Sequence, residues 1–178
     1  MLYMAVHNGL LRGFYFNSSA FSANQFEVVV FVLPLYVPID FIGLTFGYSL
    51  KTPSKLQWWN YDEKHLEQLG KELANAFIQA ERDFLSRITD AKSFYEYYKK
   101  NKKSTPRFFE AVAYSAAYSE LAIENDELKE LLSYLKKDDK IKLDWMQELH
   151  NNTEKLITGD RKSIFNNWEE QNLNVLNL

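Results

Sequence analysis

The spacing of hydrophobic residues changes once along this chain, and this change constrains the fold more than any other feature. Up to residue 50, apolar residues form short runs bounded by glycine, proline and turn-forming residues, a pattern typical of strands. From Asn60 onward they recur every three or four residues, which is typical of amphipathic helices. We therefore expect an α+β protein in which an antiparallel sheet precedes packed helices.

Three segments have the composition of strands, and together they predict a three-stranded sheet. The segments are residues 12–17, 25–33 and 41–50. The middle one is rich in valine and phenylalanine and has too few polar residues to alternate, so we expect it at the centre of the sheet. Short connections favour antiparallel neighbours, and the prolines at 34 and 38 should end regular pairing.

A long helix should follow the sheet and cover one of its faces, because an apolar sheet face must be buried. Asn60 and Glu63 predict a capping box at its start. Its apolar stripe consists of Leu66, Leu69, Leu73, Phe77, Ala80, Phe84 and Ile88. About five further helices are expected, at approximately 90–99, 105–122, 126–136, 142–158 and from 160 onward.

The length of 178 residues suits one domain with a single hydrophobic core. The hydrophobic fraction of 46% and the charged fraction of 25% are ordinary for globular proteins and argue against disorder. We expect a single domain over 1–178, with the sheet in 10–50 and helices in 60–172. The polar loop at 99–105 is the only plausible internal boundary.

Several site chemistries are excluded by composition. The chain has no cysteine, which rules out disulfides, thiolate zinc sites and cysteine nucleophiles. No signal peptide is visible at the start, and the most apolar stretch, 28–39, is too short to span a bilayer. We expect a cytoplasmic protein without a membrane partner.

The sequence contains no motif that fixes a catalytic reaction. His7, His65 and His150 are isolated and have no metal-ligand spacing. Nucleophile elbows and glycine-rich phosphate loops are absent as well. We therefore predict no catalytic, cofactor or metal site and do not favour an enzyme, although catalytic groups can converge from distant positions.

A basic segment next to aromatic residues is the best electrostatic candidate. Cations beside aromatic rings can follow a phosphate backbone while bases stack on the rings. The more ordinary interpretation is that at least half of the rings pack inward and that the lysines are solvated. Residues 94–98 supply the aromatics, and the predicted nucleic-acid contacts are Lys99, Lys100, Lys102, Lys103 and Arg107.

Trp58 and Trp59 stand between the predicted sheet and the long helix. Adjacent side chains cannot easily both point into one core, so one indole is a candidate anchor for a protein partner. The alternative, which we favour, is that both rings fill the junction between sheet and helix.

Four short motifs follow one another along the chain: Phe14-Tyr15-Phe16, Leu44-Thr45-Phe46-Gly47, Trp58-Trp59 and Phe84-Leu85. In the order of these features the chain resembles small bacterial sheet-plus-helix proteins of unknown function, some of which are thought to be immunity proteins of toxin systems. The resemblance extends over roughly residues 10–160 and implies no catalytic residues.

Three functions follow in order of preference. A non-enzymatic protein-interaction module, of the immunity or defence-associated kind, fits the net charge of −3 and the 28 aromatic residues (Phe 13, Tyr 11, Trp 4). A nucleic-acid-associated regulator that uses residues 94–107 is the alternative, and an enzyme is third. The expected partner is another protein, with no cofactor and an oligomeric state that the sequence leaves open.

Overall fold

The computed structural model describes residues 2–39, 45–119, 126–136 and 143–177. The protein is α+β, with an antiparallel sheet first and helices after it, as the sequence predicts. The chain divides into two compact units. Unit 1 comprises Met1–Leu33 and Ile42–Thr89, and unit 2 comprises Pro34–Phe41 and Asp90–Leu178. The segment after the central strand thus belongs to the helical unit.

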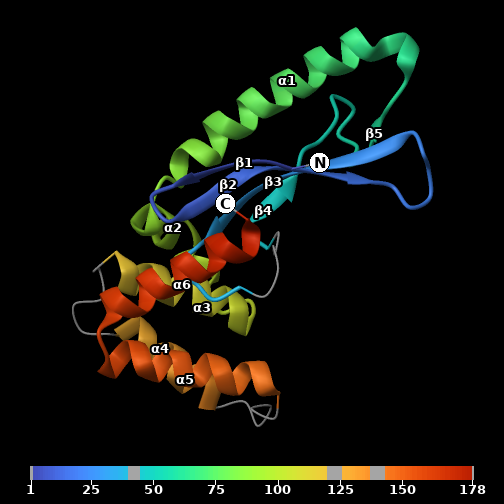
Figure 1. Ribbon diagram of the computed structural model, residues 1–178. Coiled ribbons are helices and arrows are strands. Elements are labelled where there is room, and N and C mark those ends of the chain that lie inside the picture. Colours follow the sequence, from blue (N-terminus) through green and yellow to red (C-terminus); the bar gives the residue numbers. More distant parts are fainter. Residues whose placement is uncertain (1, 40–44, 120–125, 137–142, 178) are drawn as a thin grey trace. The chain divides into compact units, whose positions relative to one another are not determined.

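The sheet of unit 1 runs in the order β1-β2-β3-β4, with β5 also paired to β3 (Figure 1). Strand β3 therefore lies between β2 and the two short strands, which confirms the central position predicted for residues 25–33. Its residues Val28, Val30 and Phe31 have no exposed surface. The strands are β1 (Leu2–His7), β2 (Leu10–Ser18), β3 (Gln25–Pro34), β4 (Gly47–Ser49) and β5 (Trp59–Asn60).

The sheet has strands that the sequence analysis did not assign. Strand β1 pairs with β2 from Leu2 to His7 and closes through a two-residue turn at Asn8 and Gly9. Both turn residues have positive φ, 48° and 74°, as hairpin turns of this length require. Asparagine followed by glycine is the strongest local signal for such a hairpin. The prediction of three strands was therefore wrong, although the sequence contains the signal for the additional strand β1.

The third predicted strand is regular only at Gly47–Ser49, and its residues 41–44 lie outside the described part of the chain. Here the backbones approach closely: a Cβ at Gly47 would lie 2.0 Å from the Val30 carbonyl oxygen. Only glycine fits such a contact, which explains its place in an aromatic strand.

Helix α1 (Leu66–Asp83) follows a short 3₁₀ turn, η1 (Glu63–His65), and precedes another, η2 (Leu85–Arg87). The cap is Asp62, whose carboxylate accepts a hydrogen bond from the Lys64 amide at 2.9 Å. The capping box predicted at Asn60 and Glu63 is therefore wrong. Asn60 lies in β5 and accepts a side-chain hydrogen bond from Gln25, because strand pairing takes priority over capping there.

Helix α1 lies along one face of the sheet, as predicted (Figure 1). The Phe77 ring of α1 is 4.6 Å from the Phe14 ring and 6.1 Å from the Phe16 ring of β2. At the other end, Arg12 donates to the Leu85 carbonyl at 2.7 Å. Aromatic packing and this hydrogen bond hold the helix on the sheet.

The helices of unit 2 agree with the predicted ones within the described residues, while positions 120–122 and 142 lie outside them. Tyr114 of α3 stacks on Trp168 of α6 at 5.6 Å, and both rings are buried. No helix in the described ranges is long and apolar enough to cross a membrane. The helices are α2 (Ala91–Tyr98), η3 (Lys99–Asn101), α3 (Pro106–Tyr118), α4 (Asp126–Lys136), α5 (Asp144–Thr158) and α6 (Arg161–Leu176).

The segment that leaves β3 is built into the core of unit 2. The Tyr36 ring is fully buried, stacks on Tyr118 at 4.2 Å and shares a 2.7 Å hydrogen bond with the Ser115 hydroxyl. Asn172 of α6 donates to the carbonyls of Leu35 and Val37 at 2.6 and 2.7 Å. A backbone without strand partners thus obtains its hydrogen bonds from a side chain.

We predict that Phe77→Ala lowers the free energy of unfolding by about 1–3 kcal/mol, because it removes ring packing against Phe14 and Phe16. The matched control is Ile78→Ala, one position along, where the side chain is exposed; we expect a change below about 0.5 kcal/mol. Urea unfolding followed by circular dichroism measures both. Equal effects of the two substitutions would show that α1 does not pack through Phe77.

We predict that Asn172→Asp destabilises the protein by at least about 2 kcal/mol at neutral pH. The substitution removes the amide donor and places a carboxylate against the carbonyls of Leu35 and Val37. Asn167→Asp on the exposed side of α6 makes the same chemical change and should be nearly neutral. Thermal unfolding of the two variants compares them, and indistinguishable transition temperatures would contradict the assigned role.

Candidate functional site

The two adjacent tryptophans have different environments. Trp59 in β5 is 1% exposed, and its indole N–H donates to the Leu50 carbonyl at 3.2 Å. Trp58 is half-buried and keeps part of its ring accessible. Of the two predicted partner contacts, Trp58 is the more exposed. Trp59 is buried, and its hydrogen bond to Leu50 links the two ends of the β4–β5 connection.

Exposed apolar residues gather on the stretch that leads into α1. Leu56 is 60% exposed, and Tyr61 and Leu66 are also exposed. The Tyr61 amide donates to the Asn24 carbonyl at 2.7 Å, which brings the β2–β3 turn, with the fully exposed Phe21, to the same stretch. We call Phe21, Leu56, Trp58, Tyr61 and Leu66 the entry surface.

The predicted basic segment occupies the tight connection between α2 and α3. Asp90 and Ser93 form a capping box at the start of α2, with hydrogen bonds of 2.8 and 3.0 Å. Thr105 caps α3 through the Phe108 amide at 3.1 Å, with Pro106 at the first helical position, as the sequence predicts. The lysines between these caps are therefore held on short, well-defined turns.

The aromatic residues before the lysines divide between the interior and the surface. Phe94 is fully buried and lies 4.9 Å from the Tyr98 ring, while Tyr97 is exposed. Tyr98 in turn meets Phe108 edge-on at 5.4 Å. The rings thus form a packed row, and only part of it is available for stacking with a ligand.

Most of the predicted basic contacts are paired with carboxylates. The Lys102 ammonium lies 2.6 Å from both Glu127 and Glu130 of α4. Lys103 lies 2.6 Å from the other oxygen of Glu130, and Lys99 is paired with Glu96 at 2.5 Å. These glutamates neutralise much of the charge that a phosphate backbone would need.

Arg107 is also held within the protein. It lies 2.9 Å from the buried Glu110 carboxylate, one turn along α3. Its guanidinium is 5.0 Å from the Trp145 ring of α5, in cation–π geometry. Among the predicted contacts, only Lys100 makes no ion pair with any described residue.

Ion pairing at α4 is reflected in the pKa values of the partners. Hydrogen bonds from Lys102 and Lys103 lower the pKa of Glu130. Burial on its own lowers the pKa of Lys102, but the hydrogen bonds to Glu127 and Glu130 outweigh it, so the pKa is raised. Both groups are therefore charged at neutral pH, and the cluster is an electrostatic link between the α2–α3 connection and α4.

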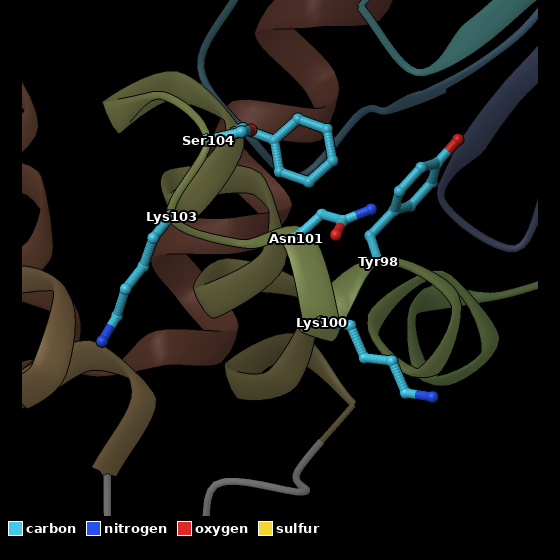
Figure 2. Close-up of a pocket in the computed structure, with 6 residues that line it drawn as sticks. Tyr98, Lys100, Asn101, Lys103 and Ser104 are labelled. Atoms are coloured by element: carbon cyan, nitrogen blue, oxygen red, sulfur yellow. The ribbon is translucent and has the colours of Figure 1, made fainter.

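Beside this cluster, the α2–α3 connection forms an open hollow of roughly 530 Å³. Figure 2 shows the Asn101 amide pointing toward the Tyr98 ring, while Lys100 and Lys103 extend away from each other. The hollow combines ring surface with one amide and two ammonium groups, a pattern common in ligand sites. Its lining consists of Tyr98, Lys100, Asn101, Lys103, Ser104 and Phe108.

Each of the three histidines has a different local environment. His65 is 2.7 Å from Asp62 on the exposed start of α1, and His150 is 3.8 Å from Glu154 on α5. His7 borders the β1–β2 turn, where Asn8 contacts its ring at 3.1 Å. Over the described ranges, no three metal-ligating side chains gather into a possible metal site.

Sequence reasoning missed a polar cluster on the sheet. Glu27 of β3 accepts hydrogen bonds from Ser49 and from Gln57. Burial on its own raises the pKa of Glu27, but these hydrogen bonds outweigh it, so the pKa lies below its ordinary value. A lone glutamate in a valine-rich strand was a readable signal, whereas its partners follow only from the strand pairing.

Comparisons with models of protein families, with curated proteins and with solved structures found no match to this chain. The geometry described above is therefore the basis for any functional proposal.

We predict that Glu130→Gln lowers the free energy of unfolding by roughly 0.5–1 kcal/mol at neutral pH. The effect is modest because 38% of the Glu130 side chain is exposed and water screens its charge. Since folding lowers this pKa, the stabilisation is present above the ordinary value of 4.5 and is lost as the pH falls through the lowered pKa. Urea unfolding between pH 7 and pH 2 should show the difference from wild type shrinking. A difference independent of pH would contradict this; Glu170→Gln is the exposed control.

Proposed function

We propose that this chain is a cytoplasmic, non-enzymatic protein-interaction module. The entry surface carries the proposal: the exposed apolar side chains of Leu56, Tyr61 and Leu66 lie on one short stretch of unit 1. The β2–β3 turn, which is hydrogen-bonded to this stretch, adds the fully exposed Phe21. Single exposed apolar residues are common, but a group of them on one segment is typical of protein-binding surfaces. Tyrosine and tryptophan, which are enriched among binding hot spots, are both present in it.

The local structure supports a binding role for this stretch. Trp59 fixes the β4–β5 connection through the Leu50 carbonyl, and Asp62 caps the turn before α1. The side chains between and beside these two fixed points project from a backbone that is already ordered. A preformed surface loses less conformational entropy on binding than a flexible one.

A narrower form of the proposal is an immunity protein that binds and neutralises a toxin. The resemblance of the feature order to small bacterial sheet-plus-helix proteins supports it. The Trp58-Trp59 pair is one of the motifs that carry this resemblance, and Trp58 lies in the entry surface.

Nucleic-acid regulation through residues 94–107 is the weaker candidate. A phosphate backbone is bound by several cations at once, each of which releases a counterion. Here Lys99, Lys102 and Lys103 already contact glutamates, which a polyanion would have to displace. The geometry therefore favours a protein partner over a nucleic-acid partner.

We predict that a photo-reactive amino acid at Leu56 or Tyr61 cross-links the same partner protein in the native host. The exposed Lys162 of α6 is the control position and should not produce that product. With the identified partner purified, Leu56→Ser combined with Leu66→Ser should weaken binding by about tenfold or more, because both remove apolar contact area. Identical products from all three positions, or unchanged affinity of the double variant, would overturn the proposed use of the entry surface.

A further inference from the structure

The hollow at the α2–α3 connection offers apolar ring surface with positive charge at its edge. Tyr98 and Phe108 are half-buried, meet edge-on at 5.4 Å, and both line the hollow. Lys100, Asn101 and Lys103 are exposed around them. An apolar floor with a few polar groups at the rim is the usual composition of a binding pocket.

The lysines at this rim differ in whether a carboxylate neutralises their charge. Lys102 forms ion pairs with one carboxylate oxygen of Glu127 and one of Glu130, and Lys103 forms an ion pair with the other oxygen of Glu130. Lys100 makes no ion pair within the ranges that the structure describes. The surplus positive charge of this connection therefore lies on Lys100, at the edge of the hollow.

The walls of the hollow are held in place before any ligand arrives. The Tyr98 ring is packed between Phe94 at 4.9 Å and Phe108 at 5.4 Å. The Ser104 amide bonds to the Asn101 carbonyl at 3.0 Å, and Thr105 caps the next helix. Rigid walls reduce the entropy that binding costs.

A compact acidic ligand fits these observations better than a polyanion. One lysine with surplus charge can attract a carboxylate, and Lys103 extends to the other side of Asn101 (Figure 2). A nucleic-acid strand needs a continuous row of available cations, which the ion pairs at Lys99 and Lys102 interrupt. An apolar side chain next to a carboxylate matches both the ring floor and the ammonium group of Lys100, whereas Lys103 is already paired with Glu130.

We infer that the hollow binds an acidic segment of a partner protein, with an apolar side chain against Tyr98 and Phe108 and a neighbouring carboxylate at Lys100. The hollow has a volume of roughly 530 Å³ and is open to solvent, so a segment of another chain can enter it from the side. This inference rests on the proposed function as a protein-interaction module, and it adds a second contact region with a defined chemistry.

The test uses the full chain labelled for NMR and the probe peptide acetyl-Asp-Glu-Phe-Glu-Asp-amide at low salt. We expect the peptide to shift the amide resonances of residues 100–105, 107 and 108, and binding to weaken as salt is added. Two comparison peptides separate the contributions: one with serine in place of phenylalanine, and one with lysine in place of every acidic residue. Both should bind less tightly than the probe. Equal binding of all three would overturn the inference.

Matched variants locate the contact. Lys100→Gln should weaken binding of the probe about two- to fivefold, and Lys100→Glu more, whereas Lys162→Glu should leave it unchanged. Phe108→Leu keeps apolar bulk but removes the ring, and it should also weaken binding; circular dichroism checks that this variant folds. Unchanged affinity of the Lys100 variants would overturn the inference, as would stronger shifts of the same residues by a short oligothymidylate than by the peptide.

Failure here is distinguishable from failure of the proposed function. Cross-linking from Leu56 and Tyr61 does not involve the hollow. A partner captured there, together with no peptide binding at Lys100, would reject this inference and leave the interaction module standing.

Discussion

The side-chain amide of Asn172 satisfies two backbone carbonyls that follow the end of β3, and this contact builds the segment after the sheet into the helical unit. Strand β3 ends at Pro34, so the following carbonyls of Leu35 and Val37 need donors from elsewhere. The amide in α6 supplies both hydrogen bonds in a buried setting. Leaving buried carbonyls without donors would cost about 1–3 kcal/mol each.

The contact has a consequence for domain organisation. Tyr36 fills the interior of the helical unit, stacked on Tyr118, although it comes from the first third of the chain. The two units are therefore interleaved along the sequence, because unit 2 includes a segment that lies between two parts of unit 1. The predicted boundary at 99–105 falls inside unit 2, whereas the division follows residues 33, 41 and 89. The single domain expected from length remains a prediction.

The same requirement, that charged and polar groups find partners, shapes the candidate sites. Glu127 and Glu130 form ion pairs with Lys102, and Glu110 forms one with Arg107. Among the described residues, the apolar side chains before α1 and the hollow beside Lys100 are two surfaces that these pairings leave open to a partner. This is why the proposed functions concern recognition by shape and local charge and do not rely on bulk electrostatics.

The sequence predicted those parts of the fold that depend on neighbouring residues, through strand composition, helical periodicity and helix capping. The valine-rich segment at 25–33 predicted the central strand, and Thr105 with Pro106 predicted the start of α3. The apolar stripe predicted α1, but the helix ends at Asp83, so the last two members of the stripe, Phe84 and Ile88, lie beyond it. The Asn8-Gly9 pair is a local signal for the β1–β2 hairpin, although the prediction of three strands did not include it.

The remaining features could not be read locally, because they depend on residues distant in sequence. The hydrogen bonds of Asn172 span more than 130 residues. Lys102 meets Glu127 across 25 residues. The basic segment therefore looked like a nucleic-acid contact in the sequence, whereas the fold places carboxylates against it. Trp58 and Trp59 could be identified as a junction, but only the fold decides which indole is buried.

The most direct test of this account is the environment of the segment that follows β3, measured by NMR on the full chain. The account predicts nuclear Overhauser contacts between the rings of Tyr36 and Tyr118, whose centres are 4.2 Å apart. It also predicts slow solvent exchange of the Asn172 side-chain amide protons, because both bonds to Leu35 and Val37 are buried. Random-coil shifts for residues 35–37 and no contact between the two rings would contradict it.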